Sequence, residues 1–207
     1  IGVTLAAFIL MQQPSIYQGV TDRIAASIKS IPEIDLWVMD KHSSSFEQPT
    51  YFNAMDIFRI QSTPGVAWAV QLYKTWMHPL HEKSQKIAMW EVIAVDPVYL
   101  LGLPKQMIAG KRQAIHHAGT VIVDGYSLQQ FASNGAAIQI GDKLSEGQNR
   151  WQIMGITKPL RTYSINPRLF ITSNHLANRA HTPSFILVKL KPGYSLTKVS
   201  QEIEKRT

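Results

Sequence analysis

The sequence has 207 residues, 45% of them hydrophobic, which is enough for one large domain or two small domains with their own cores. It contains no cysteine, which excludes disulfide frameworks, CxxC redox motifs and thiolate metal sites. Its formal net charge is +7, but the 21 lysine and arginine residues are scattered and form no basic cluster interleaved with aromatic residues, so we expect no nucleic-acid partner.

The first stretch, Ile1 to Met11, carries no charged residue, and its composition is the most unusual in the chain. A membrane span needs roughly 20 such residues, so this stretch is too short to cross a bilayer by itself. It is not preceded by a basic segment or an A-x-A site, so it does not read as a signal peptide. We expect residues 1–15 to be the outer end of a transmembrane helix that begins upstream. A buried amphipathic helix is the alternative.

Apolar residues recur at helical spacing after Pro14 and predict an amphipathic helix over residues 15–30, continuous with the apolar start and ended by Pro32. A strand over residues 35–39 follows, and then a serine-rich polar loop over residues 40–49 without periodicity. The apolar positions of the helix are Ile16, Val20, Ile24, Ile28 and Ile31.

The next stretch predicts a helix and two long strands. Asn53 is expected to cap a helix that ends at Ile60, and alternating apolar residues then predict a strand over residues 66–72. The order strand, helix, strand gives a right-handed crossover when the two strands are parallel. A further strand over residues 87–95 could pair with the previous one as an extended hairpin, and residues 98–108 are an irregular apolar segment.

Residues 120–156 are the stretch around which the rest is organised, and they read as strand, helix, strand, turn, strand. A β-branched run over residues 121–124 precedes Gly125, and Ser127 is expected to cap a brief helix over residues 128–132. Alternation predicts two half-buried strands with a polar turn between them: Ile138 with Ile140, then the turn at residues 141–147, then Trp151 with Ile153.

The last quarter of the chain predicts two strands and two helices, so the whole chain belongs to the α+β class. The elements are a strand over residues 169–172, a short helix over residues 174–179, a strand over residues 185–190, and a final helix capped by Ser195 with Leu196, Val199 and Ile203 on one face.

Several of these segments resemble the extracytoplasmic domain of ABC transporter permeases of the FtsX/MacB/LolC type. The resemblance rests on VIVD at residues 121–124, QIGD at 139–142 and WQIMGI at 151–156. Within that family the chain is most similar to the DevC-like branch, through DLWV at 35–38, AVDP at 94–97 and GLP at 102–104. These are structural residues, so the resemblance indicates a fold much better than a substrate.

The resemblance implies an α+β, MacB-like periplasmic core in two parts. Residues 16–74 and 166–207 would form a membrane-near, porter-like part built from two strand-helix-strand units. Residues 75–165 would form a smaller β-rich subdomain inserted between them. The discontinuous arrangement follows from the resemblance and not from the residues themselves.

The resemblance also implies a function. Such permeases have four spans, sit in the inner membrane, and work as homodimers with a cytoplasmic ATPase subunit, often with a HlyD-type periplasmic adaptor that leads to an outer-membrane channel. This domain would lie on the periplasmic side, pass conformational change outward through its first and last helices, engage adaptor or cargo, and have no enzyme activity of its own. The sequence has no G-x-x-x-x-G-K-[ST] and no G-x-G-x-x-G, so no nucleotide cofactor is expected in this chain and ATP would be bound by the separate subunit.

Two other classes of function remain as alternatives. Ser127 and Ser195 each follow Gly-Tyr at a strand-to-helix turn, where a hydrolase nucleophile would stand. The nucleophile elbow also needs a glycine two residues later, and the chain has Gln129 and Thr197 there, so helix capping is favoured. A base within reach of either serine would favour a soluble serine- or aspartate-dependent hydrolase. Affinity that falls steeply with salt would favour a basic lipid- or nucleic-acid-binding module.

The polar residues suggest no metal site. His78 and His81 form one histidine grouping and His116 and His117 form another, but Pro79 prevents a helix and adjacent residues point in different directions. Solvated loop histidines are the favoured interpretation. Four aspartates fall at strand ends or turns, where they are expected to satisfy their own backbone: Asp40, Asp96, Asp124 and Asp142.

The five tryptophans lie on or beside predicted strands, and most are expected in the core. Trp76 and Tyr163 lie near the loops that close the strands. We expect these two residues to be exposed and to be the candidates for partner binding.

Overall fold

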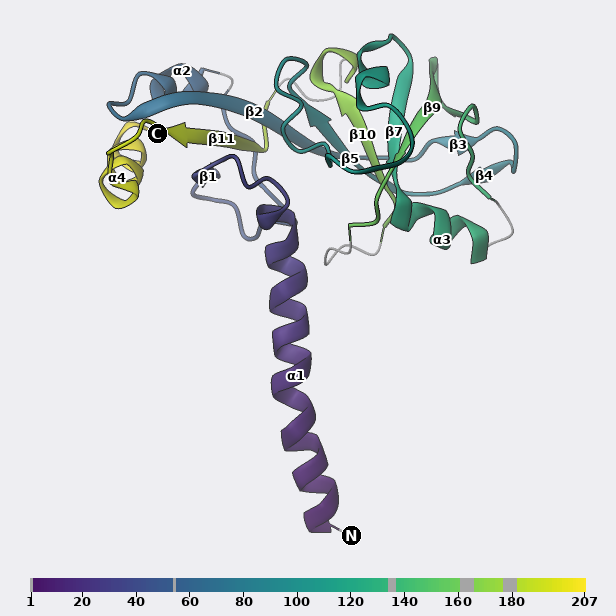
Figure 1. The fold of residues 1–207 in the computed structure, drawn as a ribbon, viewed down its shortest axis with the longest axis horizontal. Coiled ribbons are helices and arrows are strands. Elements are labelled where there is room, and N and C mark those ends of the chain that lie inside the picture. The colour runs from purple at the N-terminus through teal and green to yellow at the C-terminus, as the bar shows by residue number, and fades with distance from the viewer. Residues whose placement is uncertain (1, 54, 134–136, 161–165, 177–181) are drawn as a thin grey trace.

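The computed structural model describes residues 2–53, 55–133, 137–160, 166–176 and 182–207. Helix α1 (Gly2–Lys29) projects away from a body built on a twisted β-sheet (Figure 1). The predicted continuity of the apolar start with the following amphipathic segment is confirmed, with Pro14 inside the helix. No helix within the described part of the chain is both long and apolar enough to cross a membrane.

The described residues of the body form an 11-stranded sheet, with the order β1-β11-β2-β5-β10-β7-β9-β8-β3-β4 and with β6 paired to β9. The strands are β1 (Leu36–Val38), β2 (Val66–Met77), β3 (Leu80–His81), β4 (Lys86–Ile87), β5 (Trp90–Val95), β6 (Met107–Gly110), β7 (Thr120–Asp124), β8 (Lys143–Glu146), β9 (Asn149–Thr157), β10 (Arg168–Thr172) and β11 (Phe185–Leu190).

Strand β2 connects the two ends of the sheet. Its first part pairs with β11 as far as Leu72, and its last part pairs with β5 from Tyr73 onward. Its 12 residues reach about 40 Å at the usual rise of a strand. The predicted pairing of the two long strands is confirmed for β2 and β5, although β3 and β4 occupy the connection between them.

The predicted strand-helix-strand unit at the start of the body is confirmed. Strands β1 and β2 both pair antiparallel with β11, so they run parallel to each other, and α2 (Asp56–Gln61) joins them.

The prediction that Asn53 caps helix α2 was wrong. Helix α2 has Met55 at its N-cap, and the side chain of Asn53 instead accepts a hydrogen bond from the Met55 N–H at 3.0 Å. The Asn53 side chain therefore closes a local turn just before the helix begins.

Three hydrophobic clusters cover the sheet. At the β1–β11–β2 end, α2 and α4 (Leu196–Arg206) pack on one face, where Ile60 and Ile203 join Ile186. At the other end α3 (Gly125–Ser133) places Phe131 on Trp90, with ring centroids 5.1 Å apart.

The third cluster covers the opposite face of β5. Successive side chains of a strand point to opposite faces, and Val95 belongs to this cluster, whereas Trp90, Val92 and Ala94 belong to the α3 cluster. Phe170 and Phe185 lie in this third cluster together with Ile31, which follows α1 directly. The single turn η1 (Arg112–His116) contributes a fully buried Ile115. The end of α1 is therefore embedded in the body.

The structure confirms the strand at residues 120–124 and corrects the segments after it. Helix α3 begins at Gly125, so Ser127 lies inside the helix and does not cap it. The strand predicted at Ile138 and Ile140 was wrong, because the strand is β8, which falls inside the predicted turn. Ile138 is buried from a loop and Ile140 is 43% exposed, so their two-residue alternation did not arise from a strand.

Smaller differences concern the flanking segments. The irregular segment after residue 97 ends in β6, where Gly110 has a φ of 76° and lies against the backbone of Met154, which leaves no room for a Cβ. The strand predicted over residues 87–95 is divided into β4 and β5. The short helix predicted near residue 174 is the single turn η2 (Ser173–His175), and its remainder lies outside the described residues. Ser195 is the N-cap of α4, but its side chain makes no cap hydrogen bond.

Candidate functional site

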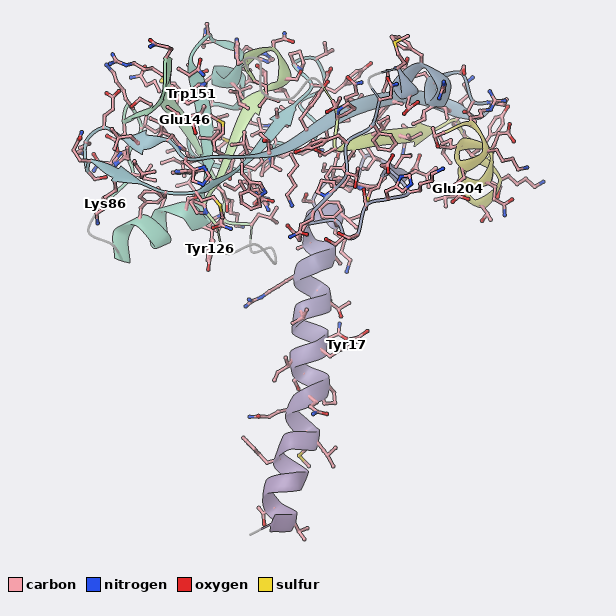
Figure 2. The ribbon with its side chains drawn as sticks, turned by 180° about the vertical axis from the view of Figure 1, so that it is seen from behind. Tyr17, Lys86, Tyr126, Glu146, Trp151 and Glu204 are labelled. Atoms are coloured by element: carbon pink, nitrogen blue, oxygen red, sulfur yellow. The ribbon has the colours of Figure 1, made fainter. Side chains whose placement is uncertain are left out.

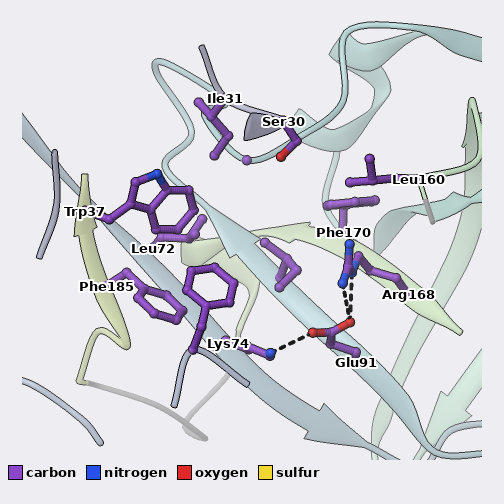
Figure 3. Close-up of a pocket in the computed structure, with 13 residues that line it drawn as sticks. Ser30, Ile31, Trp37, Leu72, Lys74, Glu91, Leu160, Arg168, Phe170 and Phe185 are labelled. Carbon is purple, nitrogen blue, oxygen red and sulfur yellow. Dashed lines mark hydrogen bonds and ion pairs between the residues drawn. The ribbon is translucent and has the colours of Figure 1, made fainter. Parts of the chain in front are cut away.

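The candidate site is a pocket where the end of α1 meets the sheet (Figure 3). Its cavity has a volume of about 40 Å³, which suffices for only a few water molecules. Ser30 and Ile31 line it from the end of α1, and the rest of the wall comes from β2, β5, β10, β11 and the segment around β1. The apolar wall consists of Ile31, Trp37, Phe46, Leu72, Ile93, Leu160, Phe170 and Phe185.

Four charged side chains form a row of ion pairs, and three of them, Lys74, Glu91 and Arg168, line this pocket. Lys74 Nζ lies 2.6 Å from Glu47 and 2.9 Å from Glu91. Arg168 donates to the same Glu91 carboxylate from Nε at 2.8 Å and from Nη2 at 2.6 Å. The side chains of Lys74 and Glu91 are 3% and 1% exposed. These ion pairs therefore link the β1–α2 segment, β2, β5 and β10.

Strand register brings these residues together. Arg168 and Glu91 are directly opposite in the parallel pair of β10 and β5, and Glu91 is opposite Trp76 in the antiparallel pair of β5 and β2. Lys74 lies two residues before Trp76, so it points to the same face of the sheet. Lys74, Glu91 and Arg168 are each the one charged residue of a mostly apolar strand, and that was the sequence signal that could have identified these three. Glu47 lies outside the strands and carries no such signal.

The ion pairs described here join two cations, Lys74 and Arg168, to two carboxylates, Glu47 and Glu91. Burial disfavours the charged form of Glu91, but the Arg168 guanidinium and the Lys74 ammonium outweigh burial, so the pKa of Glu91 lies below its ordinary value. Glu91 therefore stays ionised, and the arrangement holds charge without moving protons.

Among the described residues, neither serine considered as a nucleophile has a side-chain hydrogen bond to a base. Ser127 is fully buried, and its Oγ accepts a hydrogen bond from the Arg168 N–H at 3.0 Å. Ser195 starts α4. The prediction that both serines are structural agrees with these positions, although Ser127 binds the neighbouring strand and does not cap its own helix.

The arrangement nearest to a catalytic triad was not foreseen. His81 Nδ1 lies 2.7 Å from Ser84 Oγ, and His81 Nε2 lies 3.1 Å from Asp142 Oδ2. Ser84 is on the turn between β3 and β4, and Gln85 N–H donates to His81 O across the same turn. Ser84 does not line the pocket at the end of α1, and the two contacts of His81 join the β3–β4 hairpin to the loop before β8.

The interpretation of His81 as a solvated loop residue was wrong, because it lies in β3 and is 1% exposed. The other three grouped histidines are exposed, namely His78, His116 and His117. Within the described residues, no group of three potential ligands could hold a metal ion.

Three of the four aspartates satisfy backbone groups at turns as predicted. Asp40 accepts from His42 N, Asp96 from Val98 N and Asp142 from Gln139 N. Asp124 differs because it is 3% exposed. It accepts hydrogen bonds from Leu160 N and Thr157 Oγ1, and burial raises its pKa.

The structure describes only one of the two aromatic residues expected to bind a partner, Trp76 and Tyr163. Trp76 is 37% exposed on the same sheet face as Lys74. Tyr163 lies outside the described residues. Trp90 and Trp151 are buried in the core as expected, and Trp37 and Trp68 are partly buried.

Comparisons with known proteins agree with this architecture. The family model for the MacB-like periplasmic core domain matches residues 1–206. The periplasmic region of MacB from Actinobacillus actinomycetemcomitans superimposes with a TM-score of 0.57 at 9% identity, covering 86% of each chain. The extracellular domain of the ABC-type transporter YknZ from Gram-positive bacteria gives a TM-score of 0.54 at 14% identity, covering 82% of this chain and 87% of that one. No curated protein matches the sequence significantly.

Proposed function

The chain belongs to the family of MacB-like periplasmic core domains, the periplasmic part of MacB-like ABC transporter permeases, and from this premise we propose that it transmits conformational change during export. Cytoplasmic ATP hydrolysis on a separate subunit would drive the motion, and the body would engage a periplasmic adaptor or cargo. The domain itself catalyses no reaction in this proposal.

The observation that carries the proposal is the way α1 joins the body. The helix has 28 residues and a length of about 42 Å, and its described side chains up to Arg23 are exposed, as Figure 2 shows for Tyr17. Directly after it, Ile31 is only 6% exposed and packs in the same cluster as Leu72 and Phe185. A rigid rod that ends in a packed core transfers displacement to that core, because packed cores resist deformation.

The ion-pair chain supports transmission beyond the end of α1. Ser30 and Ile31 line the same pocket as Lys74, Glu91 and Arg168. Those three residues join β2, β5 and β10 side by side, in addition to the backbone ladders. A displacement at the end of α1 would therefore reach both ends of the sheet.

We also propose the two-part organisation, with residues 16–74 and 166–207 near the membrane and residues 75–165 as the inserted part. The change of partner within β2 at Leu72 and Tyr73 supports a boundary there. Strand β10 lies between β5 and β7, so the strands of the two parts interleave at this point. Separate hydrophobic clusters under α2 with α4 and under α3 also support two parts.

The proposed partners are a cytoplasmic ATPase subunit, a second permease copy, and a HlyD-type adaptor with an outer-membrane channel. The domain would lie on the periplasmic side of the inner membrane. Trp76 and Tyr163 remain the proposed contacts, and the exposure of Trp76 supports its part of this assignment.

The test is to interrupt the rigid connection in the intact transporter. Inserting Gly-Ser-Gly-Ser between Ser30 and Ile31 should abolish export while the ATPase subunit still hydrolyses ATP, because a flexible linker does not transmit displacement. The matched control is the same insertion between Gly147 and Gln148, in the exposed turn between β8 and β9. Unchanged export with the first insertion would contradict the proposal, as would a full-length chain without any membrane-crossing segment.

A further inference from the structure

The end of the sheet formed by β3, β4 and β8 has one covered face. Strand register places His81, Leu144 and Trp151 in one row across β3, β8 and β9, and all three are buried. Leu144 and Trp151 belong to the α3 cluster, and the His81 ring centroid lies 6.3 Å from that of Phe131 on α3. Helix α3 therefore covers this face, as Figure 1 shows.

The neighbouring row of side chains points to the opposite face, because successive residues of a strand alternate. Ile87, Leu80, Ser145 and Arg150 are direct partners across β4, β3, β8 and β9, and four strands span about 14 Å. Ile87 is 68% exposed and the Arg150 side chain is 79% exposed. An antiparallel sheet with a solvated face usually places polar residues there, so the exposed isoleucine is an exception. We call this side the open face.

Two further apolar side chains extend the open face toward the centre of the sheet. Trp76 is 37% exposed and follows the alternation away from Met77, which lies in the α3 cluster. Met89 is 41% exposed, and Trp76 lies opposite Glu91, two residues after Met89. Ile87, Met89 and Trp76 therefore form an exposed apolar group, a feature that marks contact with another protein.

The charge beside this apolar group is positive. Lys143 is exposed and lies two residues before Ser145 on β8, so it points to the same face as Arg150. The strand residue opposite Lys143 is the neutral Gln152.

The nearby carboxylates do not cancel this charge. Glu82 on the hairpin turn is 3.7 Å from Arg150, and an ion pair between exposed groups is weak. Asp142 Oδ2 is 3.1 Å from His81 Nε2, on the covered side. Glu146 follows Ser145 and accepts a hydrogen bond from the backbone between β2 and β3 at 2.9 Å.

We propose that the open face binds an amphipathic helix of the periplasmic adaptor, with its apolar stripe on Ile87, Met89 and Trp76 and with acidic residues beside Lys143 and Arg150. This inference rests on the proposed function, which gives the permease an adaptor. A helix about 10 Å wide fits the row of side chains and adds a second layer to the sheet, as α3 does on the covered face. An added strand fits less well, because β4 offers an edge of only two residues.

Photo-crosslinking in the intact permease tests the occupant. Met89 is replaced by p-benzoylphenylalanine, and the purified adaptor is added. We expect a crosslink to a helical adaptor segment that contains glutamate or aspartate. The control is the same replacement of Phe58 on α2, which is 59% exposed. The proposal is overturned if position 89 reaches only a loop or strand of the adaptor, only a second copy of the permease, or nothing, or if position 58 crosslinks equally well.

The affinity of the intact permease for the adaptor tests the apolar group. Ile87→Ser and Met89→Ser should each weaken binding about tenfold, because each removes an apolar contact from the centre of the interface. Val98→Ser is the matched control, because Val98 is 77% exposed beyond the opposite end of β5. All three positions are exposed, so the thermal unfolding midpoint should stay the same. Unchanged affinity in both open-face variants would rule out the site.

Reversing the charges tests the acidic partner. Lys143→Glu combined with Arg150→Glu should weaken binding about tenfold and make it less dependent on salt. Changing the acidic residues of the crosslinked adaptor helix to lysine should restore binding to this double variant, which a structural effect of the two substitutions would not allow. Equal affinity of the double variant and the unaltered permease would contradict the proposal.

These results are separable from the test of transmission, which measures export after the insertion at the end of α1. If that insertion abolishes export while the open-face variants bind the adaptor normally, only the docking surface is wrong. If the variants lose the adaptor while the insertion leaves export unchanged, the docking surface holds and the transmission proposal fails.

Discussion

At the scale of single residues, Glu91 is the most constrained side chain of the site. It is 1% exposed and lies between two cations that are themselves almost fully buried. Isolated burial of any one of these charges would be unfavourable, but the short distances among them compensate for desolvation. The role of Glu91 is therefore to neutralise Lys74 and Arg168 at the contact of three strands.

Replacing Glu91→Gln should lower the free energy of unfolding by about 3–5 kcal/mol, because the buried Lys74 and Arg168 would both lose the carboxylate that they share. Denaturant-induced unfolding of the chain measures this. The control is Glu202→Gln on α4, whose pair with Arg206 is 40% and 38% exposed and should contribute no more than about 0.5 kcal/mol. Equal effects of the two substitutions would contradict the proposed role of Glu91.

The same substitution makes a prediction about pH. The folded-state pKa of Glu91 lies below the ordinary value of 4.5, so its stabilising contribution is fully present above that value and is lost as the pH falls through the folded pKa. The difference in unfolding free energy between the unaltered chain and Glu91→Gln should be constant from pH 5 to 7 and should shrink below about pH 4.5. A difference that grows toward acid would show that Glu91 is protonated in the folded chain.

At the scale of elements, β2 carries the connection between the two ends of the sheet. Where β2 changes partner from β11 to β5, the side chain of Ser184 makes the hydrogen bonds that a neighbouring strand would otherwise make. Its Oγ accepts from Lys74 N–H at 2.9 Å and donates to Lys74 O at 3.1 Å, and Ser184 itself is fully buried. One hydroxyl thus satisfies both backbone groups of the residue that anchors the ion-pair chain.

Ser184→Ala should cost about 1–3 kcal/mol of unfolding free energy, because it leaves two buried backbone groups of Lys74 without partners. Thermal unfolding, with the midpoint compared at one protein concentration, measures it. Ser200→Ala on α4 provides the matched control, because its hydroxyl makes one hydrogen bond to Thr197 O in an exposed position. A midpoint as little changed by Ser184→Ala as by Ser200→Ala would mean that water replaces the hydroxyl at the junction.

At the scale of the whole molecule, the chain consists of a body with long-range strand pairing and a helix that projects from it (Figure 1). The hydrophobic clusters of the body lie between the sheet and its covering segments. Among the described side chains, the α1 segment joins them through Ile31, two residues after the helix ends. A helix without tertiary contacts has little stability beyond its own hydrogen bonds, so the two regions should open independently.

Amide hydrogens of α1 before residue 23 should therefore exchange more than about tenfold faster than those of β10, whose five residues are all buried. Hydrogen exchange of the chain, read by mass spectrometry at peptide resolution, tests this. Residues 196–206 of α4 serve as an internal reference, because this surface helix packs through Val199 and Ile203. Equal protection of α1 and β10 would mean that the projecting helix is covered, for example by a second copy of the chain.

Local patterns determined much of the fold from the sequence. Helical spacing in α1 and the alternation in β2 and β9 arise from side chains of the same segment, so they are visible without knowing what the segment contacts. Where the signal was only two residues long, as at Ile138 and Ile140, the tertiary environment overruled it. The predicted elements indicated the α+β class, and the family resemblance supplied the MacB-like core, which the structure and the family match bear out.

The candidate site was decided only by the tertiary structure. Glu47, Lys74, Glu91 and Arg168 are separated by up to 121 positions, and nothing in the spacing along the chain indicates that they meet. They meet because β10 inserts beside β5 in parallel register and because the segment before α2 folds back over β2. Short-range periodicity reports which side of a segment is buried, whereas the identity of the neighbour depends on strand order, which is set by packing of the whole sheet.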